Sequence, residues 1–439
     1  MALNVDVQIP DPLARGIPGL VVHSLDWTDA ISELFELTLE ISSTDPALRM
    51  AALVGRQAAV ALPDEPFLSS IRGMVRRARQ LTCEPAGLSR YQLTIVPPLW
   101  LATRRSNHRV FQDATVPEVV VEVIARYEGR IPRADFKLAS PGTRREYVAQ
   151  YGETDHDLLL RLLADEGMAS FFEAGGAGAW TVVGDTSVFR SALPRPIPFV
   201  EPSALERPPG SPHAQRAQST SRITTGAVNL RDFDADNPRF LLEARAGSAA
   251  FTNEAELEES EFAVGDFREG GAGESLARRR LAALTAKRTQ LRCETSFAVS
   301  AGTTWALSGH PRADFDRAWL VVRSRLTMRS EDGRVVSRRV LDCIDASTPF
   351  LPPRREKPRI AGAQTARVVA STGSTGKEID VDAMGRVLVE FRWDRRDLGE
   401  GSSRRVRVAQ AWAGPGYGLV TLPRVGDEVV VTYLDGDPD

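Results

Sequence analysis

The sequence predicts a mainly β protein with a few helices, and three observations support that prediction. Runs in which apolar and polar residues alternate recur along most of the 439 residues, and a period of two is typical of strands. Proline falls mainly between these runs, where it does not interrupt the hydrogen bonds of a sheet. Only three segments, at 115–128, 155–166 and 274–286, are predicted to be helices.

Length and composition restrict the class of protein. A chain of 439 residues is too long for one ordinary core, so about two to four domains are expected. Hydrophobic residues make up 42% and charged residues 26%, which is typical of a globular protein. The net charge of −3 gives the whole chain no general attraction to nucleic acid or to an anionic membrane. We find neither a secretory signal pattern nor an apolar run long enough for a spanning helix.

The first hundred residues are predicted to form a β-barrel or a β-sandwich. Alternating runs occupy 35–41, 58–62 and 90–96. Five prolines lie between or beyond these runs: Pro63, Pro66, Pro85, Pro97 and Pro98.

The first predicted helix, at 115–128, has apolar residues at helical spacing along one face. Thr115 and Glu118 are spaced as a capping box, and Gly129 can end the helix.

The second predicted helix, at 155–166, has Thr154 as its N-cap and Gly167 at its end. Five leucines cover more than half of its circumference, so we expect it to be buried between two layers.

The middle of the chain is predicted to be loops and short strands. From 175 to 226 the residues favour loops and edge strands, and 180–183 is one such strand. The third helix, at 274–286, carries three arginines at 278–280, which we interpret as a solvated helix face. Three further strands are expected at 296–300, 318–325 and 334–342.

A proline-rich, charged segment at 347–362 is predicted to be a stiff, extended linker, which would separate a region at 1–346 from an all-β region at 363–439. In the latter, 386–393 alternates, Val406 and Val408 continue the pattern, and 425–433 is predicted to be the last strand. About five short strands with glycine turns suggest a small closed barrel of OB type.

Two glycine-containing loops raise the question of a phosphate site. The segment "VVASTGSTGKEID" has Ser371 and Glu378 where a phosphate loop needs glycine and Ser or Thr, and no helix is predicted after it. The segment "WAGPGYG", with Gly414, Gly416 and Gly418, also lacks a following helix. We interpret the first as a hairpin loop and the second as a turn.

The sequence predicts no catalytic, cofactor-binding or metal-binding residue and no cofactor. The five histidines are dispersed, and neither metal-binding histidine spacings nor a serine-hydrolase motif occurs. The three cysteines, Cys83, Cys293 and Cys343, have no zinc spacing and are predicted to be reduced thiols.

The last predicted barrel carries the one residue pattern that is typical of a binding site, namely a site for nucleic acid. Arginines alternate there with Phe391 and Trp393, a pattern that can bind single strands. The two aromatic residues share a face with Val387 and Val389, which indicates core, and acidic residues dilute the positive charge, so we predict no nucleic-acid partner. The arginines are Arg386, Arg392, Arg395, Arg396, Arg404, Arg405 and Arg407.

Several runs together resemble the VgrG family, the valine–glycine-repeat spike proteins of bacterial type VI secretion systems. The OB-type domain of that family is similar to "GAQTARVVASTGSTGKEIDVDAMGRVLVEFRWDRRD" and to "VRVAQAWAGPGYGLVTLPRVGDEVVVTYLDGDPD". Its tail-hub part is similar to "NHRVFQDATVPEVVVEVIARY", to "REYVAQYGETDHDLLLRLLADEGMASFFE" and to "FAVGDFREGGAGESLARRRLAAL". Members often carry a Cys-Trp pair where this chain has Arg404 and Arg405, so we expect different packing there.

The resemblance implies a tail-hub fold with two β-barrels in the first region, followed by the OB-type barrel and then a β-helical needle, which these 439 residues do not reach. It implies a homotrimer that caps the hexameric Hcp tube, sits in the baseplate, and carries a PAAR-repeat tip protein and effectors. Assembly would take place in the bacterial cytoplasm, and contraction of the sheath would export the spike.

Three other interpretations stay open. The chain could belong to an extracellular contractile injection machine or a tailed phage, which genome context would separate from a type VI system. It could be the spike part of a fusion to an enzyme, although nothing up to Asp439 indicates catalysis. It could be a nucleic-acid-binding OB protein, which salt-dependent retention on single-stranded DNA would reveal.

Overall fold

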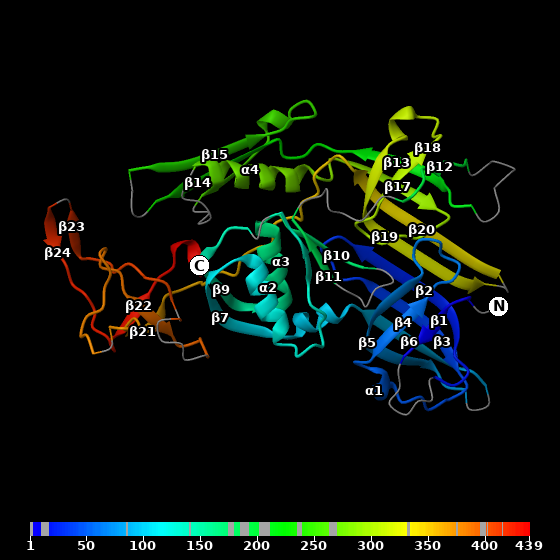
Figure 1. Ribbon diagram of the computed structural model, residues 1–439, viewed down its shortest axis with the longest axis horizontal. Coiled ribbons are helices and arrows are strands. Elements are labelled where there is room, and N and C mark those ends of the chain that lie inside the picture. Colours follow the sequence, from blue (N-terminus) through cyan, green and yellow to red (C-terminus); the bar gives the residue numbers. More distant parts are fainter. Residues whose placement is uncertain are drawn as a thin grey trace.

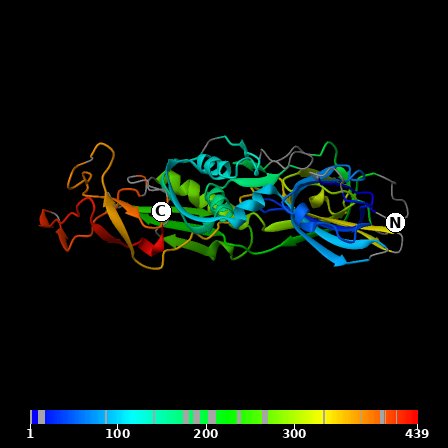
Figure 2. The same cartoon turned by 90° about the horizontal axis from the view of Figure 1, so that it is seen from below.

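The chain folds into an elongated molecule with its N-terminal strands at one end and its last strands toward the other (Figures 1 and 2). The computed structural model describes residues 3–9, 17–84, 87–139, 142–173, 180–184, 193–201, 211–234, 239–262, 270–331, 334–374, 376–395, 401, 403–414 and 416–439. We call residues 3–345 the N-terminal unit and residues 364–439 the C-terminal unit.

Strands dominate the fold, as the sequence predicts. In the N-terminal unit they are β1 (Asp6–Gln8), β2 (Val21–Ala30), β3 (Glu36–Ser43), β4 (Gln57–Ala61), β5 (Ser70–Thr82), β6 (Ser89–Val96), β7 (Ser106–Ala114), β8 (Asp135–Lys137), β9 (Arg145–Thr154), β10 (Ala169–Phe172), β11 (Trp180–Val183), β12 (Ile197–Pro198), β13 (Ala214–Ser221), β14 (Ala227–Phe233), β15 (Leu241–Gly247), β16 (Glu258–Phe262), β17 (Thr289–Thr295), β18 (Thr304–Ser308), β19 (Ala318–Glu331) and β20 (Arg334–Asp345). In the C-terminal unit they are β21 (Gln364–Val369), β22 (Leu388–Phe391), β23 (Trp412–Gly414), β24 (Tyr417–Leu419) and β25 (Glu428–Val431).

The helices are few and mostly short. The α-helices are α1 (Met50–Leu53), α2 (Val116–Ala125), α3 (Asp155–Asp165) and α4 (Gly270–Thr285). The 3-10 helices include η1 (Pro98–Arg104), η3 (Glu254–Glu256), η4 (Ala313–Phe315) and η6 (Leu434–Gly436).

One 12-stranded sheet organises the N-terminal unit, in the order β1-β4-β5-β6-β3-β2-β19-β20-β17-β13, with β12 and β18 attached beside β19. The antiparallel pair β2–β19 aligns Trp27 with Leu326, almost 300 residues later. One apolar core lies under β2 to β6, and a second lies among β13 and β17 to β20. The two predicted barrels therefore correspond to two cores that lie on one hydrogen-bonded sheet. Local sequence patterns do not reveal that β2 and β19 pair and so join them.

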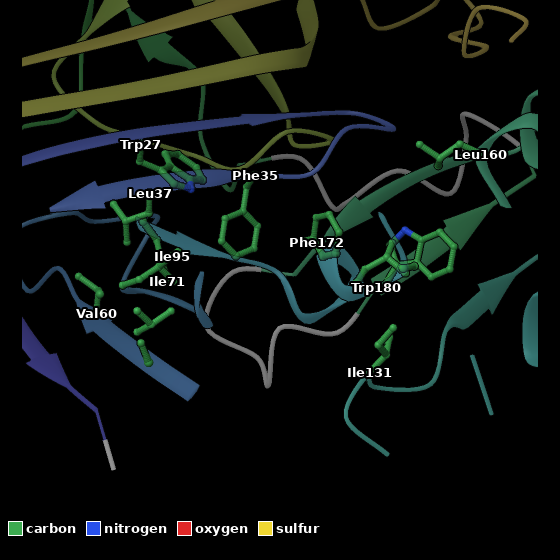
Figure 3. Packing of buried hydrophobic residues seen from close by; sticks show 14 of the residues in the cluster. Trp27, Phe35, Leu37, Val60, Ile71, Ile95, Ile131, Leu160, Phe172 and Trp180 are labelled. Carbon is green, nitrogen blue, oxygen red and sulfur yellow. The ribbon is translucent and has the colours of Figure 1, made fainter. Parts of the chain in front are cut away.

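The larger core extends from the N-terminal strands to the helices (Figure 3). Phe35, just before β3, packs edge-to-face on Phe172 of β10 with 5.4 Å between ring centroids. Trp180 and Leu160 belong to the same cluster. The strands and the helical segment therefore share one core.

The helix starts agree with their sequence signals, but α2 is shorter than the predicted 115–128. Thr115 and Glu118 form the predicted capping box of α2, which ends at Ala125, ahead of the positive φ angles of Glu128 and Gly129. The Thr154 hydroxyl accepts the backbone N–H of Asp157 at 3.1 Å, and α3 ends before Gly167 at φ +71°. All five leucines of α3 are buried, which confirms that this helix lies between layers.

The prediction that 180–183 is an edge strand is wrong. β11 is the central strand of the small sheet β10-β11-β8, and all four of its residues are buried. The glycine-rich surroundings suggested an edge, but tertiary packing places this apolar run in the core.

The prediction of a strand at 296–300 is also wrong. The strand is β17, which ends at Thr295, and the following residues form a buried loop. Two buried carboxylates replace the hydrogen bonds of a sheet: Glu65 accepts the Ala298 N–H at 2.7 Å, and Asp29 accepts the Ala301 N–H at 2.9 Å. Buried backbone donors need partners, and side chains from distant segments, Asp29 on β2 and Glu65 between β4 and β5, supply them here.

The three arginines of α4 do not form a solvated face. Only Arg278 is exposed, beside Glu274. Arg280 is 9% exposed and pairs with Glu261 on β16, and Arg279 is half-buried. Leu276 and Ala277, which share a face of α4 with Arg280, pack with Leu281 on β14 and β15. The sheet therefore covers part of the arginine-bearing surface, which sequence alone does not show.

The predicted linker is extended and without regular structure, but it is fastened along its length. Arg354 pairs with Glu261, Arg355 lies 3.6 Å from Asp157, and Lys357 lies 2.9 Å from Asp437. Figure 1 shows this segment running past α4 and α3 toward β21. It therefore holds the units together rather than spacing them apart.

The C-terminal unit contains a three-stranded antiparallel sheet, β22-β21-β25, and a separate hairpin, β23–β24. Val387 and Val406 form an isolated bridge, and Val406 and Val408 pack against the core of the unit, but the segment forms no strand in the described residues. The side chain of Arg405 instead donates to the carbonyl oxygens of Asp380 and Arg386, which ties the segment to its neighbours. The predicted last strand is shorter, since a turn holds Gly426 at φ +96° and η6 follows.

Candidate functional site

The loop from 370 to 387 connects the antiparallel strands β21 and β22, so the segment lies between paired strands, but the connection is much longer than the predicted hairpin loop and its described residues contain no strand. Ser371 donates its backbone N–H and its hydroxyl to the carboxylate of Asp380 at 2.6 and 2.7 Å. These hydrogen bonds, with the nearby Arg405, lower the pKa of Asp380. A carboxylate of the chain thus occupies the donors that a phosphate would use, and no helix follows within the described residues.

The glycine cluster at 414–418 forms the turn of the β23–β24 hairpin, as predicted, with residue 415 outside the described residues. Gly416 and Gly418 have φ angles of +78° and +143°. A Cβ at Gly418 would lie 2.7 Å from the carbonyl oxygen of Trp412. The glycines permit the backbone path of the hairpin.

The arginines of the C-terminal unit are largely engaged by acidic groups. Arg386 pairs with Asp382, Arg405 with Asp380, and Arg392 lies 3.9 Å from Glu428. Arg404 donates to the carbonyl oxygen of Asp439, Arg407 lies over Phe233 and Arg395 is exposed, whereas Arg396 lies outside the described residues. Phe391 is buried, as predicted, and stacks on the half-buried Trp393. This arrangement does not present a row of free cations beside exposed aromatic rings.

Histidine and cysteine occupy separate places. In the described part of the chain, no group of three or more His, Cys, Asp or Glu side chains could hold a metal ion. His310 stacks on Phe315 and contacts Phe199 edge-to-face, and His23 forms a hydrogen bond with Ser42. The three cysteines are free thiols, and burial raises the pKa of Cys293 to about 12.

The hydropathy of the helices gives a separate result. Among the described residues, each helix is too short or too polar to cross a lipid bilayer.

The interface between the two units has a polar aromatic centre at Gln364, the first residue of β21. Its side-chain oxygen accepts hydrogen bonds from Trp393 Nε1 at 2.9 Å and from the Tyr433 hydroxyl at 3.0 Å. Its side-chain nitrogen donates to the hydroxyl of Tyr151 on β9 at 2.6 Å. Trp393 also packs against the apolar group around Tyr147. One amide therefore joins both units.

A buried ionic cluster lies beside this centre. Arg161 of α3 is 1% exposed, donates to Glu153 at 2.6 Å and lies 3.9 Å from the carboxylate of Asp439. Asp439 also accepts from the Ala149 N–H and pairs with Lys357 at 2.9 Å. Burial alone would raise the pKa of Asp439, but Lys357 and Arg161 lower it below its ordinary value. We call Arg161, Glu153, Lys357, Asp437 and Asp439 the junction cluster.

The sequence analysis missed both of these centres. The run "LLLRLLAD" indicates the buried ionic cluster, because Arg161 lies among leucines on a helix that is predicted to be buried on most sides. A buried arginine requires an acidic partner, although its identity cannot be read from local sequence.

The far end of the C-terminal unit exposes apolar side chains. On β23, on β24 and directly after β24 these are Trp412, Tyr417, Leu419 and Val420, which are 54–73% exposed. A two-stranded hairpin is marginally stable alone in water, and exposed apolar groups of this size favour association. We call these four residues the apolar tip.

Two family models match the chain in succession. Residues 28–332 match the phage tail baseplate hub (GPD) family, and residues 371–439 match the type VI secretion system/phage-baseplate injector OB domain. The order of the two matches agrees with the predicted order of a tail-hub fold and an OB-type barrel.

Curated relatives and a solved structure agree with these matches. The type VI secretion system spike protein VgrG1a of Pseudomonas aeruginosa is 33% identical over 100% of this chain and 69% of its own length. VgrG4b of the same organism is 34% identical over 96% of this chain, which spans only 53% of that relative. A solved structure of an E. coli component of the type VI secretion system has the same fold, with a TM-score of 0.70 at 18% sequence identity. The match covers 99% of this chain and 97% of that chain, which is described as similar to the bacteriophage T4 tail proteins gp27 and gp5. The chain therefore belongs to the VgrG family of type VI secretion system spike proteins.

Proposed function

We propose that the chain forms the hub and the base of the spike in a type VI secretion machine, and that it acts mechanically rather than as an enzyme. The supporting observation is the similarity to VgrG1a along the whole chain. The divisions 1–346 (hub), 347–362 (linker) and 363–439 (OB-type barrel) are part of this proposal.

The working form in this proposal is a homotrimer. The apolar tip gives a physical reason, because burial of each large apolar side chain stabilises an interface by roughly 1.5–3 kcal/mol. A threefold axis at this end would cover the tips of three chains with one another.

In the assembled machine, the trimer caps the hexameric Hcp tube, contacts the baseplate and carries a needle, a PAAR-repeat tip protein and effectors. Assembly takes place in the cytoplasm, and sheath contraction exports the spike. The junction cluster, the linker contacts and the hydrogen bonds of Gln364 support a mechanical role, because thrust on the N-terminal unit must reach the C-terminal unit through such contacts.

The mass of the protein in solution tests the trimer. We expect a species of three times 48.0 kDa at micromolar concentration. Replacing Trp412 and Tyr417 by serine should reduce it to the single-chain mass. Val121→Ser is the matched control, since Val121 is also exposed but lies on α2. A trimer unaffected by the paired tip substitutions would contradict the assignment of the interface.

Neither alternative function is favoured by the residues. An extracellular injection machine or a phage would use the same fold, so gene neighbours must separate these cases. Nucleic-acid binding is disfavoured, because acidic partners engage Arg386, Arg392 and Arg405.

A further inference from the structure

The linker leaves a groove between itself and α4. Two cavities of about 220 and 230 Å³ lie there. Both are lined by Ala283 and Leu284 of α4 and by Leu351 and Pro353 of the linker. They therefore adjoin, and we call them together the α4 groove.

The walls of the α4 groove combine an apolar floor with an excess of positive charge. Phe350 and Leu351 contribute to the floor. Five basic and three acidic residues line the two cavities: Arg222, Arg279, Arg280, Lys287, Arg354, Asp165, Glu259 and Glu261. All three acidic residues lie in the cavity that Arg279, Arg280 and Arg354 line, where acidic and basic residues are equal in number. The other cavity, lined by Arg222 and Lys287, is basic and apolar.

Some basic side chains of the groove pair with an acidic residue, and others do not. Arg280 and Arg354 share Glu261. Arg279 has only a 3.5 Å contact from Nη1 to the Ser275 hydroxyl, and its buried Nε has no hydrogen-bond partner. Within the described residues, Arg222, Lys287 and Arg279 form no ion pair with a carboxylate.

A half-buried guanidinium with a free donor is unfavourable in the isolated chain. The planar donors of arginine match a carboxylate, which would satisfy them with charge-assisted hydrogen bonds. A phosphate ion would pair with the basic side chains, but it would leave the apolar floor around Phe350 uncovered. An acidic segment with aliphatic side chains would use both features.

We propose that the α4 groove is a docking site for an acidic, partly aliphatic peptide segment of a partner protein. A carboxylate of the segment pairs with Arg279, and a neighbouring aliphatic side chain lies against Leu284, Phe350 and Leu351. The site is separate from the apolar tip and goes beyond the proposed trimer, because it requires neither a second copy of the chain nor a threefold axis.

Fluorescence anisotropy with a labelled synthetic peptide of alternating glutamate and leucine tests the site. Matched lysine–leucine and glutamate–serine peptides separate the contributions of charge and apolar contact. We expect the glutamate–leucine peptide to bind, and Arg279→Met to weaken its binding by about 10- to 100-fold, as the loss of one hydrogen bond to a charged group implies. Arg278→Met is the matched control and should change the affinity by less than about 2-fold, because Arg278 lies on the exposed side of the same helix.

Ala283→Phe provides a second variant, which fills the groove without changing its charge and should also abolish binding. Thermal unfolding shows whether each variant is folded, and solution mass reports on the trimer independently. The proposal is overturned if the glutamate–leucine peptide does not bind the wild-type chain, binds Arg279→Met or Ala283→Phe equally well, or binds no better than the lysine–leucine peptide.

Discussion

Replacement of Arg161 by methionine tests the junction cluster, because methionine keeps most of the side-chain length and removes the charge. Arg161 is 1% exposed and holds Glu153, which is 7% exposed, through two hydrogen bonds of 2.6 and 3.2 Å. Asp439 keeps Lys357 as a partner in the variant, whereas Glu153 loses its cation. Removal of one member of a buried pair costs about 3–5 kcal/mol, since the other charge stays buried.

The cost should depend on pH in a defined direction. Burial raises the pKa of Glu153 even in the wild-type chain, where Arg161 partly opposes the shift. Without Arg161 this pKa rises further, and the folded state then binds a proton more tightly than the unfolded state. The destabilisation should therefore be complete above the raised pKa and should decrease as the pH falls through it.

Differential scanning calorimetry measures the effect. With an unfolding entropy of about 2.1 cal/mol/K per residue, a loss of 3–5 kcal/mol lowers Tm by roughly 4–7 °C for the N-terminal unit, residues 3–345. The double variant Arg161→Met/Glu153→Gln should recover most of the loss, because it leaves no unpaired buried charge. Equal losses in the single and double variants, or a penalty that grows on acidification, would refute the reasoning.

Three further predictions concern other parts of the chain. Gln364→Leu removes hydrogen bonds to three aromatic side chains, each of which stabilises the folded state by about 1 kcal/mol. Amide exchange at 147–151 and 388–391 should therefore accelerate, and unchanged exchange would show that Gln364 does not join the units. The carboxylate of Glu254 is buried, but three backbone N–H groups and Arg288 bind it and lower its pKa to about 2. The stabilisation that it gives should be present above about pH 4.5 and be lost as the pH falls toward 2. Glu254→Gln should remove this pH dependence from amide exchange at 224 and 250–251, whereas Glu256→Gln, at an exposed position, should leave it unchanged. Trp180→Ala should cost about 3–5 kcal/mol in chemical denaturation, while Trp412→Ala in a monomeric sample should cost little; comparable losses would contradict the assigned burial.

Local sequence signals predict much of the secondary structure, because they report on short-range physics. The capping box at Thr115 and Glu118 and the leucines of α3 lead to helices with the expected starts and burial. The glycines at 416 and 418 lead to a hairpin turn, because their φ angles are positive.

The errors arise where distant residues decide the structure. The run at 296–300 looks like a strand, but Glu65 and Asp29 bind the loop's N–H groups at Ala298 and Ala301. The pairing of β2 with β19 joins segments almost 300 residues apart. The partners of Arg161 and Arg280 likewise come from other elements, so sequence indicates only that buried arginines need acids.

The central claim is that this chain is the hub and spike base of a type VI secretion machine. The most direct test is Hcp release into the medium by a host strain in which this gene is the sole spike gene. The account predicts that deletion of the gene stops Hcp release without lowering intracellular Hcp, and that the wild-type gene restores release. Undiminished Hcp release from the deletion strain would contradict it.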